Sequence, residues 1–142
     1  MEQHKDIGSY IDIAYYRLKT AEEDLDAAKK LFQDNSIRIA NNRAYYAIYH
    51  AVSAVHALDK KAYKRHKDAI SNFNKDYIRT EIFPKEFGRR IVRAEEIRHN
   101  SDYSDFYIAK REDAEGLIGT AEELISLIKR YVCEEAQKTE SK

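Results

Sequence analysis

The residues of this chain that could do chemistry gather in one short stretch, between Arg93 and Tyr103. The stretch holds two arginines, a histidine, an acid and a tyrosine: Arg93, Arg98, His99, Asp102 and Tyr103. Arginine binds phosphate through a planar fork of N–H donors, and histidine can carry a proton near neutral pH. Asp102 and Tyr103 can orient either group. These residue types together favour a site that binds or cleaves a phosphate ester.

A simpler interpretation of the same stretch is a charged, solvated helix end. Cations stabilise the C-terminus of a helix through its dipole. Asn100, Ser101 and Asp102 are poor helix formers, so we expect the helix to end near residue 100 and a loop to follow. Both interpretations stay open at this point, because composition alone does not separate a binding site from a solvated terminus.

Arg43, Tyr46 and His50 form a second polar group within a helical pattern. They are three or four residues apart, so they share one face of a helix. Either they hydrogen-bond to one another inside a packed bundle, or they line a pocket.

A basic run follows at residues 60–67, in a connecting segment or at a helix start. Lys64, Arg65, His66 and Lys67 lie beside the aromatic Tyr63. Such a run is a solvated loop in most proteins, but it can also follow the backbone of RNA.

A metal or cofactor site finds little support in the sequence. Glu96 and His99 form one Glu-x-x-His pair, whereas a ferritin-like site needs two such pairs and a glutamate from each of two further helices. Each of the other histidines lacks a glutamate three residues before it, and residues 36–58 contain no glutamate. Gly-rich phosphate loops, G-x-S-x-G and C-x-x-C are also absent. We therefore expect neither a metal nor a cofactor.

The elements that must position these side chains are helices. With four glycines and one proline, Pro84, the chain is typical of long helices with few breaks. Apolar residues recur every three or four positions, as in a bundle. This pattern predicts helices at residues 7–32, 36–58, 67–77, 84–100 and 111–136.

The fold that follows is an all-α, up-and-down helical bundle of about five helices, four long and one short. The helix at residues 36–58 carries a stripe of alanines, which lets the backbone of a neighbouring helix come close. We therefore expect this helix to be the central one. Residues 101–110 carry three aromatics, so we expect that loop to pack down. Residues 1–136 are expected to form a single domain, and residues 137–142 a frayed polar tail.

Composition limits the classes of partner. The 142 residues include 25 basic and 25 acidic side chains, so any nucleic-acid contact needs a local patch. A single cysteine, Cys133, excludes an internal disulfide and indicates an intracellular protein. We see no signal peptide and no apolar run near the ~20 residues of a membrane span. We expect a cytoplasmic protein without a membrane partner.

Several of these stretches together resemble a known family. They are Arg43-Ala-Tyr-Tyr-Ala-Ile-Tyr-His-Ala-Val, the connector Arg65-His66-Lys67, Phe87-Gly-Arg-Arg-Ile-Val-Arg-Ala-Glu-Glu-Ile-Arg98, and Asp102-Tyr103. The combination looks like the HEPN domain family, in the small stand-alone prokaryotic branch that often accompanies a minimal nucleotidyltransferase. The resemblance covers about residues 11–131.

The resemblance implies a homodimeric helical bundle. Many HEPN proteins are metal-independent RNases that act as toxins of toxin–antitoxin or defence systems, with a nucleotidyltransferase as antitoxin. On this basis we expect a metal-independent endoribonuclease toxin. The alternative is a non-catalytic module that binds RNA or nucleotide and partners a nucleotidyltransferase.

The family signature is an arginine followed after four to six residues by a histidine, and two registers fit it here. Arg93 with His99 satisfies the spacing. The context of Arg98 with Asp102-Tyr103 resembles the family's arginine more closely, and Tyr103 then takes the place of the histidine. Tyrosine, with an ordinary pKa of about 10, is a poor base at neutral pH. The second register therefore favours a weak nuclease or a binding domain.

Overall fold

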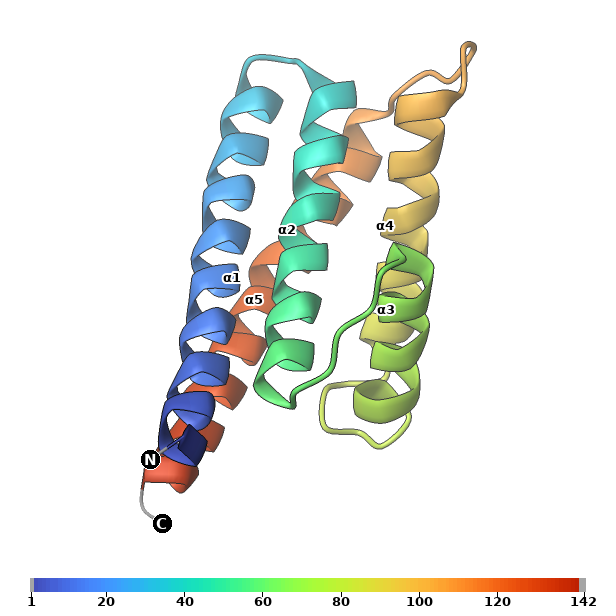
Figure 1. Ribbon diagram of the computed structural model, residues 1–142. Helices are drawn as coiled ribbons and strands as arrows, with labels where there is room; N and C mark the ends of the chain where they lie inside the picture. Colours follow the sequence, from blue (N-terminus) through green and yellow to red (C-terminus); the bar gives the residue numbers. More distant parts are fainter. Residues whose placement is uncertain (1, 141–142) are drawn as a thin grey trace.

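The computed structural model describes the backbone of residues 2–140 and the side chains of residues 9–139. Its elements are α1 (Glu2–Gln33), α2 (Ile37–Leu58), α3 (His66–Phe73), the π-helical turn η1 (Asn74–Ile78), α4 (Glu86–Tyr103) and α5 (Arg111–Glu140). No strand occurs in this part of the chain. The structure confirms the expected all-α bundle of four long helices and one short helix (Figure 1).

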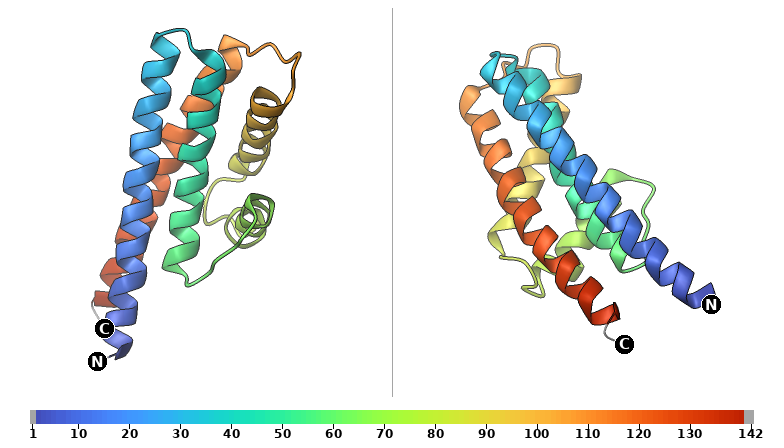
Figure 2. Two further views of the ribbon diagram at one scale, coloured as in Figure 1. Left: turned by 45° about the horizontal axis from the view of Figure 1, so that its top comes forward. Right: turned by 90° about the vertical axis from the view of Figure 1, so that its left-hand side faces the viewer.

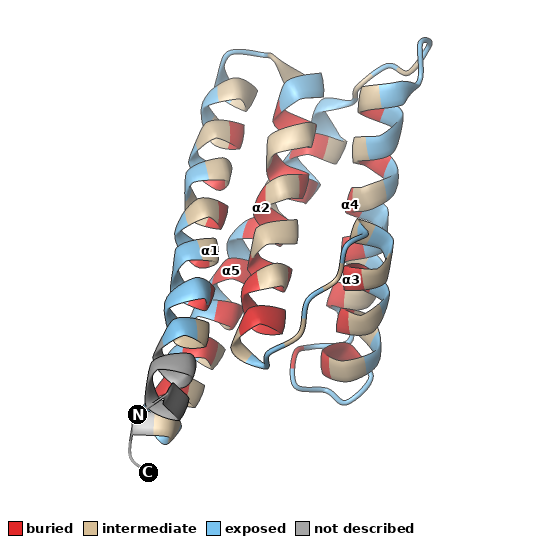
Figure 3. Cartoon of the chain, in the orientation of Figure 1, coloured by how far each residue is buried: buried red, intermediate tan, exposed pale blue. Residues whose placement is uncertain are grey.

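The second helix, α2, is central, as its alanine stripe predicts. It contacts α1 and α5 on one side, and α3 and α4 on the other. Figure 2 shows α1, α2 and α5 side by side, with α3 and η1 crossing the end of α2 that leads into them. The buried faces of α1, α2, α4 and α5 turn toward one another (Figure 3).

The core around α2 is built largely from small side chains. Five alanines of α2 are fully buried: Ala40, Ala44, Ala47, Ala51 and Ala54. Three alanines of α1 meet the same core, namely Ala14, Ala21 and Ala28. Because the distance between packed helix axes depends on the side chains at the contact, these alanines allow a close approach.

The turn between α1 and α2 is set by Asn35, whose φ of 63° is left-handed. The N–H of Ser36 donates to the carbonyl of Leu31 at 2.8 Å, and that of Asn35 to the carbonyl of Phe32 at 3.0 Å. This pair of bonds is a Schellman motif. Asparagine tolerates the left-handed region better than most residues, so the sequence can end α1 here without a glycine.

The expected end of α4 near residue 100 is wrong, because the helix continues to Tyr103. Ser101 is fully buried, and its hydroxyl donates to the carbonyl of Ile97 at 2.7 Å. The side-chain oxygen that makes serine a poor helix former is thus satisfied within the helix. The whole stretch from Arg93 to Tyr103 is therefore helical.

The loop at residues 104–110 does not pack down as expected. Phe106 is 94% exposed and Ile108 is 81% exposed, while only Tyr107 turns inward with a buried hydroxyl. Ser104 is extended, which directs the chain away from the bundle at the end of α4 (Figure 1). At the other end of α5, the helix continues to Glu140, and residues 141–142 of the expected tail lie outside the described part.

Within the described residues, no helix is both long enough and apolar enough to cross a membrane.

The alanine stripe gives a first test. Replacing Ala51 by leucine inserts three carbon atoms into a site with no exposed surface, and overpacking of this kind costs about 1–3 kcal/mol. We expect Ala51→Leu to lower the free energy of unfolding by that amount in urea titrations. Ser126→Leu, on the exposed face of α5, is the control and should change it by less than about 0.5 kcal/mol. Equal effects of the two substitutions would contradict the close packing of α2.

His56 joins α2 to α3 from within the core. Its side chain is almost fully buried, and its Nε2–H donates to the carbonyl of Ala69 at 2.8 Å. Burial lowers the pKa of His56, and the hydrogen bond to Ala69 offsets this effect only in part. The imidazole is therefore neutral in the folded protein.

The lowered pKa of His56 predicts a loss of stability in mild acid. Below the unfolded-state pKa of about 6.5, the unfolded chain takes up a proton that folded His56 resists, so the free energy of unfolding falls as the pH falls. Urea unfolding at pH 7.0 and pH 5.5 should show this decrease in the wild type and a smaller one in His56→Gln. An identical decrease in both proteins would assign the acid sensitivity to other groups.

Candidate functional site

Arg98 is the centre of the polar cluster between α2 and α4. Its side chain is only 12% exposed. The guanidinium lies 4.7 Å from the ring centre of Tyr45, 5.9 Å from that of Tyr103 and 6.0 Å from that of Tyr46. Such contacts stabilise a cation through the negative faces of the rings.

The charge of Arg98 is incompletely balanced by acids. Asp102, one turn further along α4, lies 3.8 Å from the guanidinium, at the outer limit of an ion pair. The Nε of Arg98 is buried and has no hydrogen-bond partner among the described residues. Burial disfavours the charge, but Tyr45, Tyr46 and Asp102 together outweigh burial and raise the pKa of Arg98. This part of the structure thus holds a permanent cation that is only weakly paired with an acid.

His66, the first residue of α3, is held against α2 beside this cation. Its Nδ1 is 3.1 Å from the hydroxyl of Tyr45, and its ring stacks on Tyr49 with ring centres 3.9 Å apart. Tyr46 meets the same imidazole edge-on at 5.7 Å. Burial raises the pKa of Tyr45 far above its ordinary value, so its hydroxyl keeps its proton.

Arg43, Tyr46 and His50 lie together on α2, and Asp24 of α1 joins two of them. The carboxylate of Asp24 is 3.2 Å from Nη1 of Arg43 and 3.5 Å from Nε2 of His50. The guanidinium of Arg43 lies 5.0 Å over the ring of Tyr46, and the ring of His50 is 6.1 Å from it. The three residues therefore contact one another, and their role as a pocket lining stays a prediction.

The end of α4 is fixed by residues of the first turns of α2. Arg38 donates from Nε to the backbone carbonyl of Ser101, and Asn41 donates to the hydroxyl of Ser101 at 3.2 Å. Asn42 donates to the carboxylate of Asp102 at 2.9 Å. These bonds hold Asp102, and through it the surroundings of Arg98, in one position.

The structure does not bring Arg93 and His99 together as it does Arg98 and the tyrosines. Arg93 is 60% exposed and pairs with Glu96 at 3.9 Å and with Asp113 of α5 at 3.5 Å. His99 is exposed, with its ring 5.0 Å from that of Tyr103. On a continuous helix a spacing of six residues separates two side chains by roughly 120° around the axis.

Arg98 and His99 do share one hollow, of about 290 Å³. Its lining consists of Glu95, Glu96, Arg98, His99 and Asn100. Because two of these five residues are acidic, the hollow itself is a poor binding place for an anion.

The residues of the basic run differ in their exposure to solvent. Lys64, Arg65 and Lys67 are exposed, and Arg65 pairs with Asp68 of the same helix at 3.1 Å. His66 instead turns toward the tyrosines of α2. The exposed members of the run therefore flank His66 in sequence, and their role in binding RNA stays a prediction.

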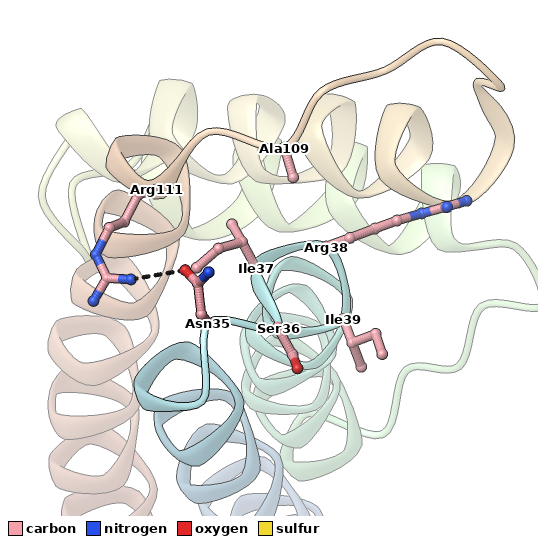
Figure 4. A pocket seen from close by; sticks show the side chains of 7 residues that line it. All are labelled: Asn35, Ser36, Ile37, Arg38, Ile39, Ala109 and Arg111. Carbon is pink, nitrogen blue, oxygen red and sulfur yellow. Dashed lines mark hydrogen bonds between the residues drawn. The ribbon is translucent and has the colours of Figure 1, made fainter.

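A larger depression, of about 670 Å³, lies at the α1–α2 turn (Figure 4). Its lining consists of Asn35, Ser36, Ile37, Arg38, Ile39, Ala109 and Arg111. Arg111 donates to the side-chain oxygen of Asn35 at 3.3 Å, while Arg38 extends away from it toward the end of α4. The lining has two arginines but no histidine or carboxylate, so it lacks a group for proton transfer.

Within the described chain, no three histidine, cysteine, aspartate or glutamate side chains come together as metal ligands would. Residues that sequence reasoning did not single out include Asp24, Arg38, Asn42, Tyr45 and Tyr49. The four-residue spacing of Tyr45 and Tyr49 could have revealed a shared face. Asp24 gave no such signal, because its partners lie on another helix.

The hydrogen bonds from Arg38 and Asn41 to Ser101 give a second structural test. Arg38→Ala removes the donor to the carbonyl of Ser101, so the last turn of α4 should open more often. We expect hydrogen exchange of the amides at residues 101–104 to accelerate at least several-fold, with exchange in α1 unchanged. Arg89→Ala, at an exposed position of α4, is the control. Unchanged amide hydrogen exchange at residues 101–104 would mean that the hydrogen bond from Arg38 does not stabilise the end of α4.

Comparison with known proteins adds independent information. The sequence model of the HEPN domain matches residues 14–131. A UPF0332 protein of Thermotoga maritima is 32% identical over 125 residues, which is 83% of this chain and 94% of that protein. The "Putative toxin MJ0605" of Methanocaldococcus jannaschii is 32% identical over 117 residues (82% of this chain, 87% of the toxin). The "Putative toxin MJ0142" of the same organism is 26% identical over 115 residues (81% and 78%).

Proposed function

We propose that this chain, which belongs to the HEPN domain family, is a metal-independent endoribonuclease that acts as a toxin. The observation that carries the proposal is Arg98, a largely buried cation that is set among tyrosine rings, weakly paired with Asp102 and close to His66. RNA offers what such a site needs, because its phosphate is an anion and its 2′-hydroxyl is a built-in nucleophile. Single-stranded RNA can also stack its bases on aromatic side chains.

In this proposal Arg98, and not Arg93, binds the scissile phosphate. Arg93 is exposed and already pairs with Glu96 and Asp113, whereas Arg98 has Asp102 at the outer limit of an ion pair and aromatic rings around it. Asp102 orients Arg98, and the exposed Tyr103 positions the substrate. Lys64, Arg65 and Lys67 follow the RNA backbone as mobile cations next to the site.

The toxin role and its partner rest on the relatives. Two of them are named putative toxins, and a toxin requires an antitoxin. We propose a minimal nucleotidyltransferase as that antitoxin, and a homodimer as the active form. The loop at residues 104–110 supports a protein contact near the site, because Phe106 and Ile108 would otherwise expose apolar surface to water.

The second candidate is a module that binds RNA or nucleotide without cutting it. The observation that favours it is Tyr103, which stands where the family signature has a histidine if Arg98 is the signature arginine. Tyrosine is a poorer general base than histidine at neutral pH. This module would still use Arg98 and the tyrosines for binding.

The experiment is cleavage of labelled single-stranded RNA in EDTA by the purified wild type. We expect products with 2′,3′-cyclic phosphate and 5′-hydroxyl ends. Removal of a group that stabilises developing charge costs about 10²–10³ in rate, so Arg98→Ala should lose at least ~100-fold. Arg89→Ala, an exposed arginine of the same helix, should cut like the wild type.

Further variants separate the two registers and the two functions. Cleavage that survives Arg98→Ala and Tyr103→Phe but is lost in Arg93→Ala and His99→Ala would assign the site to Arg93 and His99. RNA binding without any cleavage by the wild type would reject the nuclease and leave the binding module.

A further inference from the structure

We propose that His50 and His66 form the acid–base pair of this site, with His50 as the base and His66 as the acid. The proton-transfer groups then come from α2 and α3, not from the stretch of α4 that carries the family signature. This inference rests on the proposed ribonuclease function and names the residues that carry out its proton transfers.

The two imidazoles border the same aromatic surface of α2. The ring of His66 lies 3.9 Å from that of Tyr49, and the ring of His50 lies 5.8 Å from it. Both also contact Tyr46, at 5.7 Å for His66 and 6.1 Å for His50. Both histidines therefore contact the same two tyrosines of α2, which is the arrangement from which we argue that they act as a pair.

His50 has the surroundings of a general base. Its Nε2 faces the carboxylate of Asp24 at 3.5 Å, so the ring hydrogen belongs on Nε2 and the lone pair on Nδ1. Asp24 also stabilises the imidazolium that forms when Nδ1 takes up a proton. Burial lowers the pKa of His50, and the nearby Arg43 and Arg17 lower it further, against the opposite effect of Asp24. The free imidazole is therefore neutral and ready to accept a proton.

His66 has the surroundings of a general acid. Its Nδ1 is fixed by the hydroxyl of Tyr45, which leaves Nε2 for the substrate. Burial lowers the pKa of His66, and so do the positive charge of Arg98 and the neighbouring His50. A phosphate on Arg98 brings a negative charge that offsets the effect of the arginine, so substrate binding favours the protonated imidazolium.

The reaction that these positions allow is an internal transesterification. His50 takes the proton of the 2′-hydroxyl as the 2′-oxygen forms its bond to phosphorus. The bond from phosphorus to the 5′-oxygen breaks, and that oxygen receives the Nε2 proton of His66. Arg98 stabilises the charge that develops on the non-bridging oxygens. The products are a 2′,3′-cyclic phosphate and a 5′-hydroxyl, and exchange with water returns both histidines to their starting states.

The test measures cleavage by the full-length protein in EDTA across the pH range. General acid–base catalysis contributes about 10²–10⁴-fold, so His50→Gln and His66→Gln should each lose at least ~100-fold in kcat/KM. The wild type should show a bell-shaped pH profile, with the acidic limb missing in His50→Gln and the alkaline limb missing in His66→Gln. His56→Gln is the matched control, because His56 lies on α2 but contacts α3 and the core.

A second substrate separates catalysis from folding. In RNA with sulfur in place of the 5′-bridging oxygen, the leaving group is a thiolate and needs no proton. This substrate should restore His66→Gln to near the wild-type rate and should leave His50→Gln slow. A purely structural role of His66 would keep both variants slow on it and would overturn the acid assignment.

The remaining outcomes divide between the two proposals. If the wild type cleaves RNA and both glutamine variants stay within threefold of it, the histidine pair is wrong and the ribonuclease function stands. If the wild type cleaves no RNA at all, the ribonuclease function fails, and the acid–base pair fails with it.

Discussion

The close packing of neighbours around the alanine-lined face of α2 is the constraint on which the rest of the structure depends. Because α2 has small side chains where it meets α1 and α5, it can be the central helix of the bundle. Of its larger side chains, Tyr45 contacts residues of α3 and α4, whereas Arg43 and His50 contact Asp24 of α1. The separation of small and large residues on one helix thus creates both the core and the candidate site.

The polar side of α2 places a cation where water cannot fully solvate it. Arg98 is shielded by Tyr45 and Tyr46, and its ion-pair partner Asp102 lies 3.8 Å away. An arginine in such a place keeps its charge but has unsatisfied hydrogen-bonding capacity. This incomplete pairing is the reason for proposing Arg98 as the phosphate-binding residue. Where α2 faces α1, Asp24 pairs with Arg43 and His50 and orients their side chains.

Much of this fold could be predicted from the sequence, since amphipathic periodicity directly reflects helix burial. The alanine stripe likewise identified the central helix. The end of α4 could not be predicted, because Ser101 is held by Arg38 and Asn41, about sixty residues away. Local propensity contains no information about such a contact.

The candidate site was predictable only in part, for a similar reason. The shared face of Arg43, Tyr46 and His50 follows from helical spacing alone. The inward turn of His66 does not, because the residue stands in a basic run whose other members are exposed. Its position depends on Tyr45 and Tyr49, which only the tertiary structure brings to it. The same holds for Asp24, whose partners belong to a different helix.

The position of α5 in the chain affects the order in which parts of the protein are synthesised and folded. This helix packs along both α1 and α2, and the ion pairs Lys29–Glu122 at 2.7 Å and Glu22–Lys129 at 3.1 Å span the contact with α1. Every residue of the candidate site precedes α5 in the chain, so the ribosome makes these residues first. The bundle nevertheless closes only when α5 has emerged. Translation would therefore complete the chemical groups well before it completes the scaffold that holds them in place, which delays any activity until α5 has been made.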